Sequence, residues 1–201
     1  MFTNTLKALV ASLAMTTAAS AAVEYDPEAH KMTVTGNTTQ YQVNAAYAVL
    51  KDNDVVTVEM SGPGGDYYAG LYLGRMLKKE GVTIIIKEGS TCVSACAFAA
   101  LGGDRLIVDG ALWFHVPFLT GIPTNKTVLE IAQYFGIGYL EMPMYFADIG
   151  VTINFANVLM KRTSECKFYV IEDGAEASKL KNTEKVNSRV VIKHTILNKC
   201  R

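Results

Sequence analysis

The chain of 201 residues has no excess of either charge, no long apolar run beyond its N-terminus and no visible repeat. Its 19 basic and 19 acidic residues balance, and no basic patch with interleaved aromatic residues is visible. Nothing therefore favours nucleic acid or an anionic membrane surface as a partner. No low-complexity linker divides the sequence, so we expect a single domain after any leader.

The first 21 residues have the form of a secretory signal peptide. Lys7 gives a positive start, residues 8–15 are apolar, and Ala19-Ser20-Ala21 has the small residues that signal peptidase accepts. We expect cleavage after Ala21, which leaves residues 22–201 as the mature domain. Because no later run is long enough to span a bilayer, the sequence predicts a soluble exported protein, periplasmic or secreted.

Four cysteines follow the leader: Cys92, Cys96, Cys166 and Cys200. An even number behind a signal peptide favours disulfides. Residues four apart at a helix start can lie within disulfide range, so we expect a local Cys92–Cys96 bridge, with Cys166–Cys200 tying down the C-terminus. A metal site is the alternative, but the Cys92-x-x-x-Cys96 spacing lacks a nearby second pair of ligands, and we expect no metal.

Strand and helix patterns alternate along the first half of the chain. The strands are expected over residues 31–35, 55–60, 83–87, 105–108 and 112–114, and the helices over residues 42–50, from Tyr68 to Gly81, and over 94–101. A turn is expected at Gly36-Asn37. This order predicts an α/β fold with mostly parallel strands and right-handed crossovers.

The second half is richer in aromatic residues and methionine. Helices are expected over residues 127–135, 139–149 and 154–161, with breaks at Gly136, Gly138 and Pro143, and late strands over 165–171 and 189–197. Aromatic and methionine side chains recur along the expected helix of residues 139–149, at Tyr139, Met142, Met144, Tyr145 and Phe146. This stripe is either a buried helix face, or an exposed face that forms a substrate groove or a subunit contact.

Three unusual positions each follow a strand, where parallel sheets collect their chemistry. They are the glycine-rich turn 61–65, Ser94 among small residues before an alanine-rich helix, and His115 after an apolar strand. A serine at a helix start, a histidine base and free backbone amides are the parts of an acyl-transfer site. Simpler interpretations remain: Ser94 as a helix N-cap, His115 as a buried hydrogen-bonded side chain, and Gly64-Gly65 as an ordinary turn.

Four motifs in this order resemble one family. They are Ser61-Gly62-Pro63-Gly64-Gly65 with Gly70, Cys92-Val93-Ser94-Ala95-Cys96, Gly102-Gly103-Asp104-Arg105, and Gly110-Ala111 leading to His115. Residues 32–117 thereby resemble the Clp protease proteolytic subunit and the signal-peptide peptidases of the crotonase-like superfamily, and most of all the small exported Clp-protease-like proteins of bacteria. The resemblance implies a superhelix of repeated strand–strand–helix units.

The resemblance also implies roles for individual residues. Ser94 matches the nucleophile, His115 the general base, and the backbone amides of Gly64 and Ala95 the oxyanion hole. It implies a serine peptidase that needs no cofactor and acts on a peptide or protein. Relatives form rings or trimers, so a homo-oligomer is one expectation, although no motif in this chain fixes its number.

The match departs from the family at the triad acid. Alignment on Lys167-Phe168 puts Cys166 where the aspartate is expected. Our choice for the acid is Glu165, which a one-residue bulge could redirect toward His115; a solvated surface carboxylate and a Ser–His dyad are the alternatives. A non-catalytic binding or assembly protein is the first rival function. An acyl-thioester enzyme is the second, which the Ser94–His115 pair speaks against.

Overall fold

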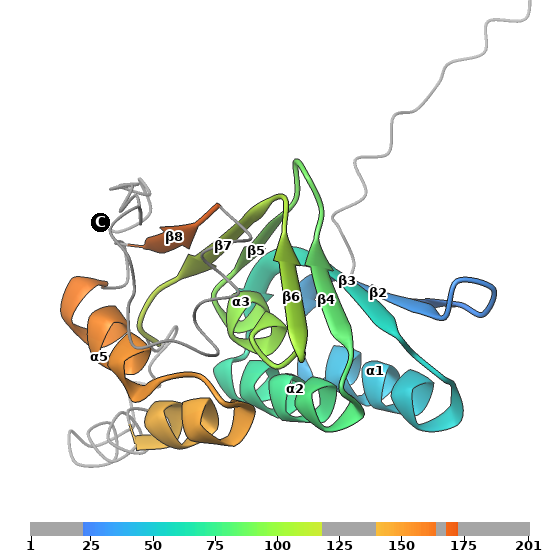
Figure 1. The fold of residues 1–201 in the computed structure, drawn as a ribbon, viewed down its shortest axis with the longest axis horizontal. Coiled ribbons are helices and arrows are strands. Elements are labelled where there is room, and N and C mark those ends of the chain that lie inside the picture. Colours follow the sequence, from blue (N-terminus) through green and yellow to red (C-terminus); the bar gives the residue numbers. More distant parts are fainter. Residues whose placement is uncertain (1–21, 118–139, 164–167, 173–201) are drawn as a thin grey trace, which may run out of the picture.

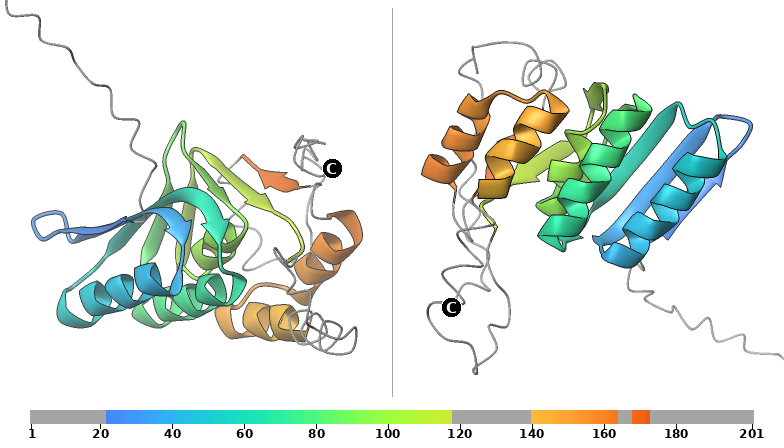
Figure 2. Two further views of the ribbon diagram at one scale, coloured as in Figure 1. Left: turned by 180° about the vertical axis from the view of Figure 1, so that it is seen from behind. Right: turned by 90° about the horizontal axis from the view of Figure 1, so that it is seen from below.

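A computed structural model describes residues 22–117, 140–163 and 168–172. The strands form one branched sheet, and the helices α1, α2 and α3 lie side by side on one face of it (Figures 1 and 2). The sheet is mixed and mostly parallel, which confirms the α/β class predicted from the sequence. In the described ranges, no helix has the length and apolar character needed to cross a membrane.

The sheet begins with a hairpin of β1 (Ala22–Asp26) and β2 (Lys31–Thr38), and β2 then pairs in parallel with β3 (Thr57–Gly65). Alternate residues of β2, starting with Met32 and Val34, are buried, which is the pattern of a strand with one covered face. The turn expected at Gly36-Asn37 is wrong. Gly36 has a φ of 84° and causes only a shift of register between Thr35 and Asn37, and the strand continues to Thr38 because Asn37 and Thr38 pair with β3.

Two capped helices follow β2 and β3. Helix α1 (Gln40–Asp52) begins at Thr39, whose hydroxyl accepts the Gln42 amide at 3.2 Å. Helix α2 (Tyr67–Glu80) begins at Asp66, whose carboxylate accepts the Ala69 amide at 2.8 Å. It ends at Gly81 in the left-handed conformation, with φ of 67°, as its sequence predicted.

Strand β3 belongs to both branches of the sheet. Its first half, Thr57–Glu59, pairs with β4 (Thr83–Ile86), and β4 pairs with β6 (Arg105–Val108). Its second half pairs with β5 (Thr91–Val93) at Gly62, and β5 pairs with β7 (Ala111–Phe114). The second branch ends with β8 (Tyr169–Ile171), which runs antiparallel to β7. The glycine-rich stretch expected to be a turn is therefore the end of a strand.

Helix α3 (Ala95–Ala100) is the most enclosed of the described helices, since all six of its residues are buried. It packs on α2 and on β3. The helix of residues 140–149 fixes it from the other side, because the buried Tyr145 hydroxyl donates to the Phe98 carbonyl at 2.5 Å. Residues 140–149 are continuous through Pro143, where a break was expected. Helix α5 (Ile153–Arg162) follows.

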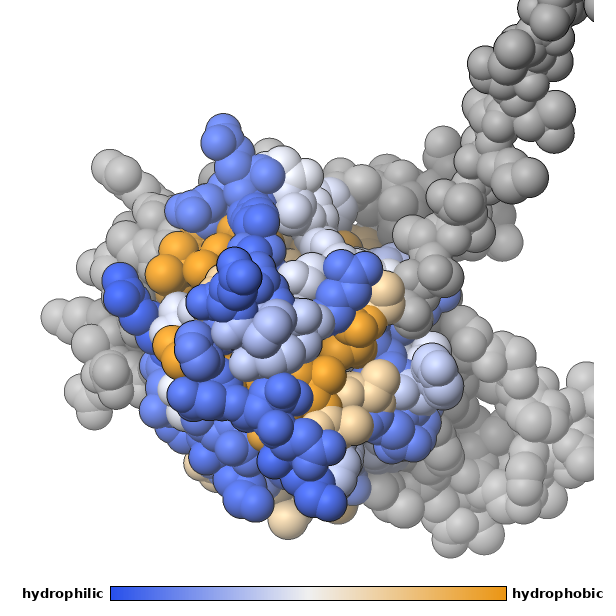
Figure 3. All heavy atoms as spheres, turned by 90° about the vertical axis from the view of Figure 1, so that its right-hand side faces the viewer, coloured by the Kyte–Doolittle hydropathy of each residue, from blue (hydrophilic) through white to orange (hydrophobic). Residues whose placement is uncertain are grey.

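The aromatic stripe of the second half divides between core and surface. Met142, Tyr145 and Phe146 are fully buried, which confirms core packing for these three, whereas Met144 is exposed. Exposed large hydrophobic side chains are scattered over several elements, and the face shown in Figure 3 is mostly hydrophilic with small hydrophobic areas; such side chains in the described ranges are Tyr41, Tyr47, Val56, Tyr72, Leu140, Met144 and Met160. Tyr139 and the elements expected over 127–135 and 189–197 lie outside the described residues.

Candidate functional site

Ser94 lies between β5 and α3 in a backbone conformation that residues with a side chain rarely adopt. Its φ is 54° and its ψ is −122°, and such a conformation typically costs about 1–3 kcal/mol. Two hydrogen bonds hold it there: its amide donates to the Trp113 carbonyl at 2.8 Å, and its carbonyl accepts the Phe98 amide at 3.0 Å. In α/β-hydrolases, a strained strand-to-helix turn exposes the nucleophilic serine.

The side chain of Ser94 does not cap the helix. Although Ser94 occupies the N-cap position of α3, its hydroxyl makes no capping hydrogen bond. The residue is half-buried. The simplest interpretation of this serine, a helix N-cap, is therefore wrong, and its hydroxyl is not engaged in holding the helix end.

A disulfide spans the strained residue. Cys92 at the centre of β5 and Cys96 in α3 are bonded, with their α-carbons 5.3 Å apart and both side chains buried. This confirms the predicted local bridge. Because the bridge fixes both elements that flank Ser94, it limits how far the turn between them can relax. Cys166 and Cys200 lie outside the described residues.

Gly64 brings the end of β3 against the same turn. Its φ is +89°, and a Cβ atom at this position would lie 2.8 Å from Cβ of Ser94 and 2.5 Å from the Val93 carbonyl oxygen. The same Cβ would be 3.0 Å from the amide nitrogen of Ala95. Only glycine fits there. The main chains of Gly64 and Ala95 thus lie side by side next to Ser94, and the Ala95 amide belongs to the first turn of α3, whose amides have no acceptor within the helix.

His115 follows β7, the parallel neighbour of β5. The register pairs Val93 with Trp113, and the Ser94 amide bonds to the Trp113 carbonyl, so Ser94 and His115 leave adjacent strands at the same end of the sheet. The His115 side chain is buried, and its ring packs edge-to-face on Phe168 with centroids 5.0 Å apart. The Phe168 ring also packs against the Trp113 ring, with their centroids 5.7 Å apart.

One nitrogen of the His115 ring is assigned by its partner. Nδ1 lies 2.7 Å from the Val116 carbonyl oxygen, and a carbonyl can only accept, so Nδ1 carries the proton. In the neutral ring, Nε2 then holds the lone pair that a general base needs. On the Nδ1 side of the ring, the described partner is thus the backbone carbonyl of Val116.

Thr163, at the end of α5, is the residue that sequence reasoning missed. Its hydroxyl accepts the Val116 amide at 3.0 Å and donates to the Leu159 carbonyl at 2.7 Å. The side chain is buried. A threonine 47 positions away from Val116 gives no sequence signal of this contact. Glu165, the predicted acid, lies outside the described residues.

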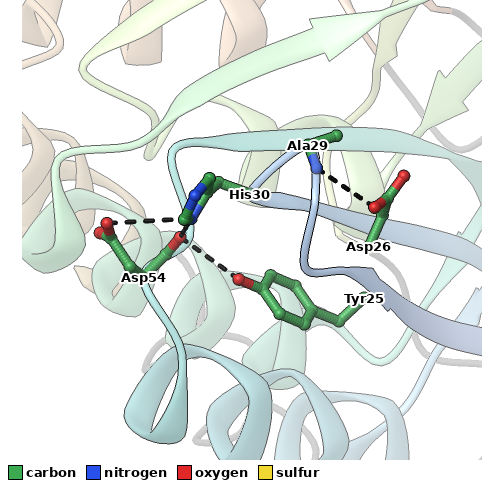
Figure 4. Close-up of polar contacts among 5 residues, drawn as sticks. All are labelled: Tyr25, Asp26, Ala29, His30 and Asp54. Carbon is green, nitrogen blue, oxygen red and sulfur yellow. Dashed lines mark hydrogen bonds and ion pairs between the residues drawn. The ribbon is translucent and has the colours of Figure 1, made fainter.

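His30 is structural. Figure 4 shows its ring beside Asp54, whose carbonyl oxygen lies 2.9 Å from His30 Nδ1 and also accepts the Tyr25 hydroxyl at 3.5 Å. The Asp26 carboxylate accepts the amides of Glu28 and Ala29 in the same turn. These contacts fasten the β1–β2 hairpin to the chain entering β3.

Among the side chains that the structure describes, no three histidine, cysteine, aspartate or glutamate residues gather as a metal site would require. No protein-family model matches the chain, and a search of curated proteins finds no significant match.

Proposed function

We propose that this protein is an exported serine hydrolase, a peptidase, in which Ser94 is the nucleophile and His115 the general base. The observation that carries this proposal is the strained backbone of Ser94. The Ser94 hydroxyl does not cap α3, and the Gly64 backbone packs against the same turn. Backbone strain of about 1–3 kcal/mol persists only where the surrounding structure enforces it, and strained residues cluster at active sites.

The proposed reaction proceeds in successive steps, each with a named group of this chain. The Ser94 oxygen attacks the carbonyl carbon of a peptide while His115 Nε2 takes the hydroxyl proton. The negative charge that develops on the carbonyl oxygen is stabilised by the amides of Gly64 and Ala95. The intermediate collapses as His115 gives its proton to the leaving amine, and water then hydrolyses the acyl-serine by the same steps in reverse. No cofactor is needed.

We also propose the crotonase-like fold of the Clp protease family. In support, β4 belongs to one branch of the sheet, β5 to the other, and α3 follows them. The pair β6 and β7 repeats this passage from branch to branch. The buried disulfide supports export, since such bonds persist in oxidising compartments.

Hydrolysis kinetics test the proposal. The full chain, expressed for export and purified, is assayed on an activated ester and on an unstructured protein such as casein. We expect Ser94→Ala and His115→Ala to lower kcat at least about 1000-fold, whereas Ser90→Ala, a change in the turn before β5, retains activity. Equal rates for wild type and Ser94→Ala, or no hydrolysis by the wild type, would contradict the proposal; the second result favours a binding or assembly protein.

A further inference from the structure

Three hydrogen bonds and the main chain of Val116 connect α5 to His115. The Leu159 carbonyl accepts the Thr163 hydroxyl, whose oxygen accepts the Val116 amide at 3.0 Å. The Val116 carbonyl in turn accepts His115 Nδ1 at 2.7 Å. Thr163 and His115 are both buried and Val116 between them is half-buried, so these bonds are partly shielded from bulk water. The path thus fixes the main chain on both sides of Val116.

The residue that carries the acceptor is restrained from two directions. Thr163 holds the peptide between His115 and Val116 by its N–H group. Pro117 follows Val116, and a residue before proline is confined to extended conformations. The Val116 carbonyl is therefore held in one orientation, and with it the ring that bonds to it. Packing of Phe168 against the ring adds a third restraint.

We propose that Thr163 is the positioning residue for His115, acting through the main chain of Val116. It fills the orienting part of the role that a buried carboxylate has in a Ser–His–Asp triad, where the acid keeps the imidazole in one tautomer. The Thr163 hydroxyl bonds to the Val116 amide and the ring bonds to the Val116 carbonyl, so Thr163 acts on the base only through two successive peptide groups. This inference rests on the proposed function for its catalytic meaning, but the tautomer of His115 is a property of the protein alone.

Nuclear magnetic resonance measures the tautomer directly. The ring nitrogens of His115 are observed in wild type, in Thr163→Val, which keeps the shape but removes the hydroxyl, and in Thr163→Ser, which keeps the hydroxyl. We expect a proton on Nδ1 in wild type and Thr163→Ser, and a mixture of tautomers in Thr163→Val. Thr152→Val is the control, because Thr152 begins the same helix without a capping bond from its side chain.

Kinetics supply the second readout. We expect Thr163→Val to lower kcat about 10- to 100-fold with KM within about twofold, and Thr163→Ser to stay within about threefold of wild type. A purely structural residue would instead change the folded fraction without changing the tautomer. Unchanged tautomer and kcat in Thr163→Val, or equal losses in the serine variant, would overturn the inference.

Two further outcomes separate this inference from the proposed function. A wild-type protein that hydrolyses nothing, yet shows the tautomer change only in Thr163→Val, supports the positioning role while the peptidase proposal fails. If Thr163→Val does not fold, the inference is tested on the wild type alone. A proton on Nε2 of neutral His115, or fast exchange of the Val116 amide hydrogen, overturns the inference. A proton on Nδ1 together with slow exchange of the Val116 amide hydrogen supports it.

Discussion

At the scale of the residue, Ser94 has a conformation that its neighbours impose. Its positive φ is held by backbone bonds to Trp113 and Phe98 and enclosed by the Cys92–Cys96 bridge. Gly64 completes the enclosure because it has no side chain: a single added carbon would meet Ser94 and Val93 at 2.8 and 2.5 Å. The geometry of the site therefore requires a residue without a Cβ atom at position 64.

Gly64→Ala tests this dependence, with Gly89→Ala as a matched control. Both glycines have a positive φ, +89° and +75°, but nothing lies within 4 Å of a Cβ at Gly89. The strain of placing alanine at positive φ is thus common to both variants. We expect Gly64→Ala to lower the free energy of unfolding by about 1–3 kcal/mol more than the control, and hydrolysis to fall by about 100-fold if the oxyanion donor moves. Equal effects in both variants would contradict the account of Gly64.

Apart from the Cys92–Cys96 pair, the sequence predicted the types of the site residues but not their partners. A serine among small residues and a histidine after an apolar strand were visible, and so was the Cys92–Cys96 bridge. The contact of His115 with the Val116 carbonyl was not, because a main-chain acceptor exists at every position. Thr163 was hidden for a different reason: it joins the site across 47 residues, through folding alone.

At the scale of the element, β3 connects the two branches of the sheet and delivers Gly64 to Ser94. Its apolar first half was predicted, whereas its glycine-rich end was expected to turn, since local preference disfavours glycine in strands. Pairing with β2, at Asn37–Gly64 and Thr38–Gly65, overrides that preference. The strands β1 and β5 were missed as well; β5 has only three residues, too few for an alternating pattern to be recognised in the sequence.

An ion-pair cluster ties β3 to its neighbours at Glu59. The Glu59 carboxylate lies 3.3 Å from Lys31 Nζ on β2 and 2.7 Å from Lys87 Nζ after β4, and its side chain is only 14% exposed. Burial by itself opposes the charge on Glu59, but hydrogen bonds and charge from the two lysines outweigh it. The net result is a lowered pKa for Glu59.

The lowered pKa of Glu59 sets the sign of a pH effect. A carboxyl that is more acidic when folded stabilises the native state above the pKa of the unfolded chain, about 4.3, and this contribution is lost as pH falls through the lower folded value. We expect Glu59→Gln to lower the free energy of unfolding by on the order of 1 kcal/mol at pH 7 and by less at pH 3. Denaturant unfolding at the two pH values measures this difference. Glu24→Gln, at an exposed carboxyl of β1, is the control. A loss that is the same at both pH values would contradict this assignment.

At the scale of the whole molecule, the catalytic candidates come from segments that the chain order separates. The β3 end, the β5–α3 turn and the β7 end meet because parallel pairing places their carboxyl ends at one edge. The alternation of strands and helices predicted such a meeting in general terms. The branching at β3 could not be predicted, because it depends on which strand pairs with which half of β3, and this is decided by packing between distant segments.

The central claim is that folding makes Ser94 a nucleophile, and covalent labelling with a fluorophosphonate tests it most directly. The native protein, wild type and Ser94→Ala, is treated with the probe and digested with trypsin, and the peptide of residues 88–105 is sequenced by mass spectrometry. The account predicts a label on Ser94 in the folded wild type, none in Ser94→Ala, and none in wild type unfolded before treatment. Equal labelling of the two proteins, or no label on the native wild type, would contradict it.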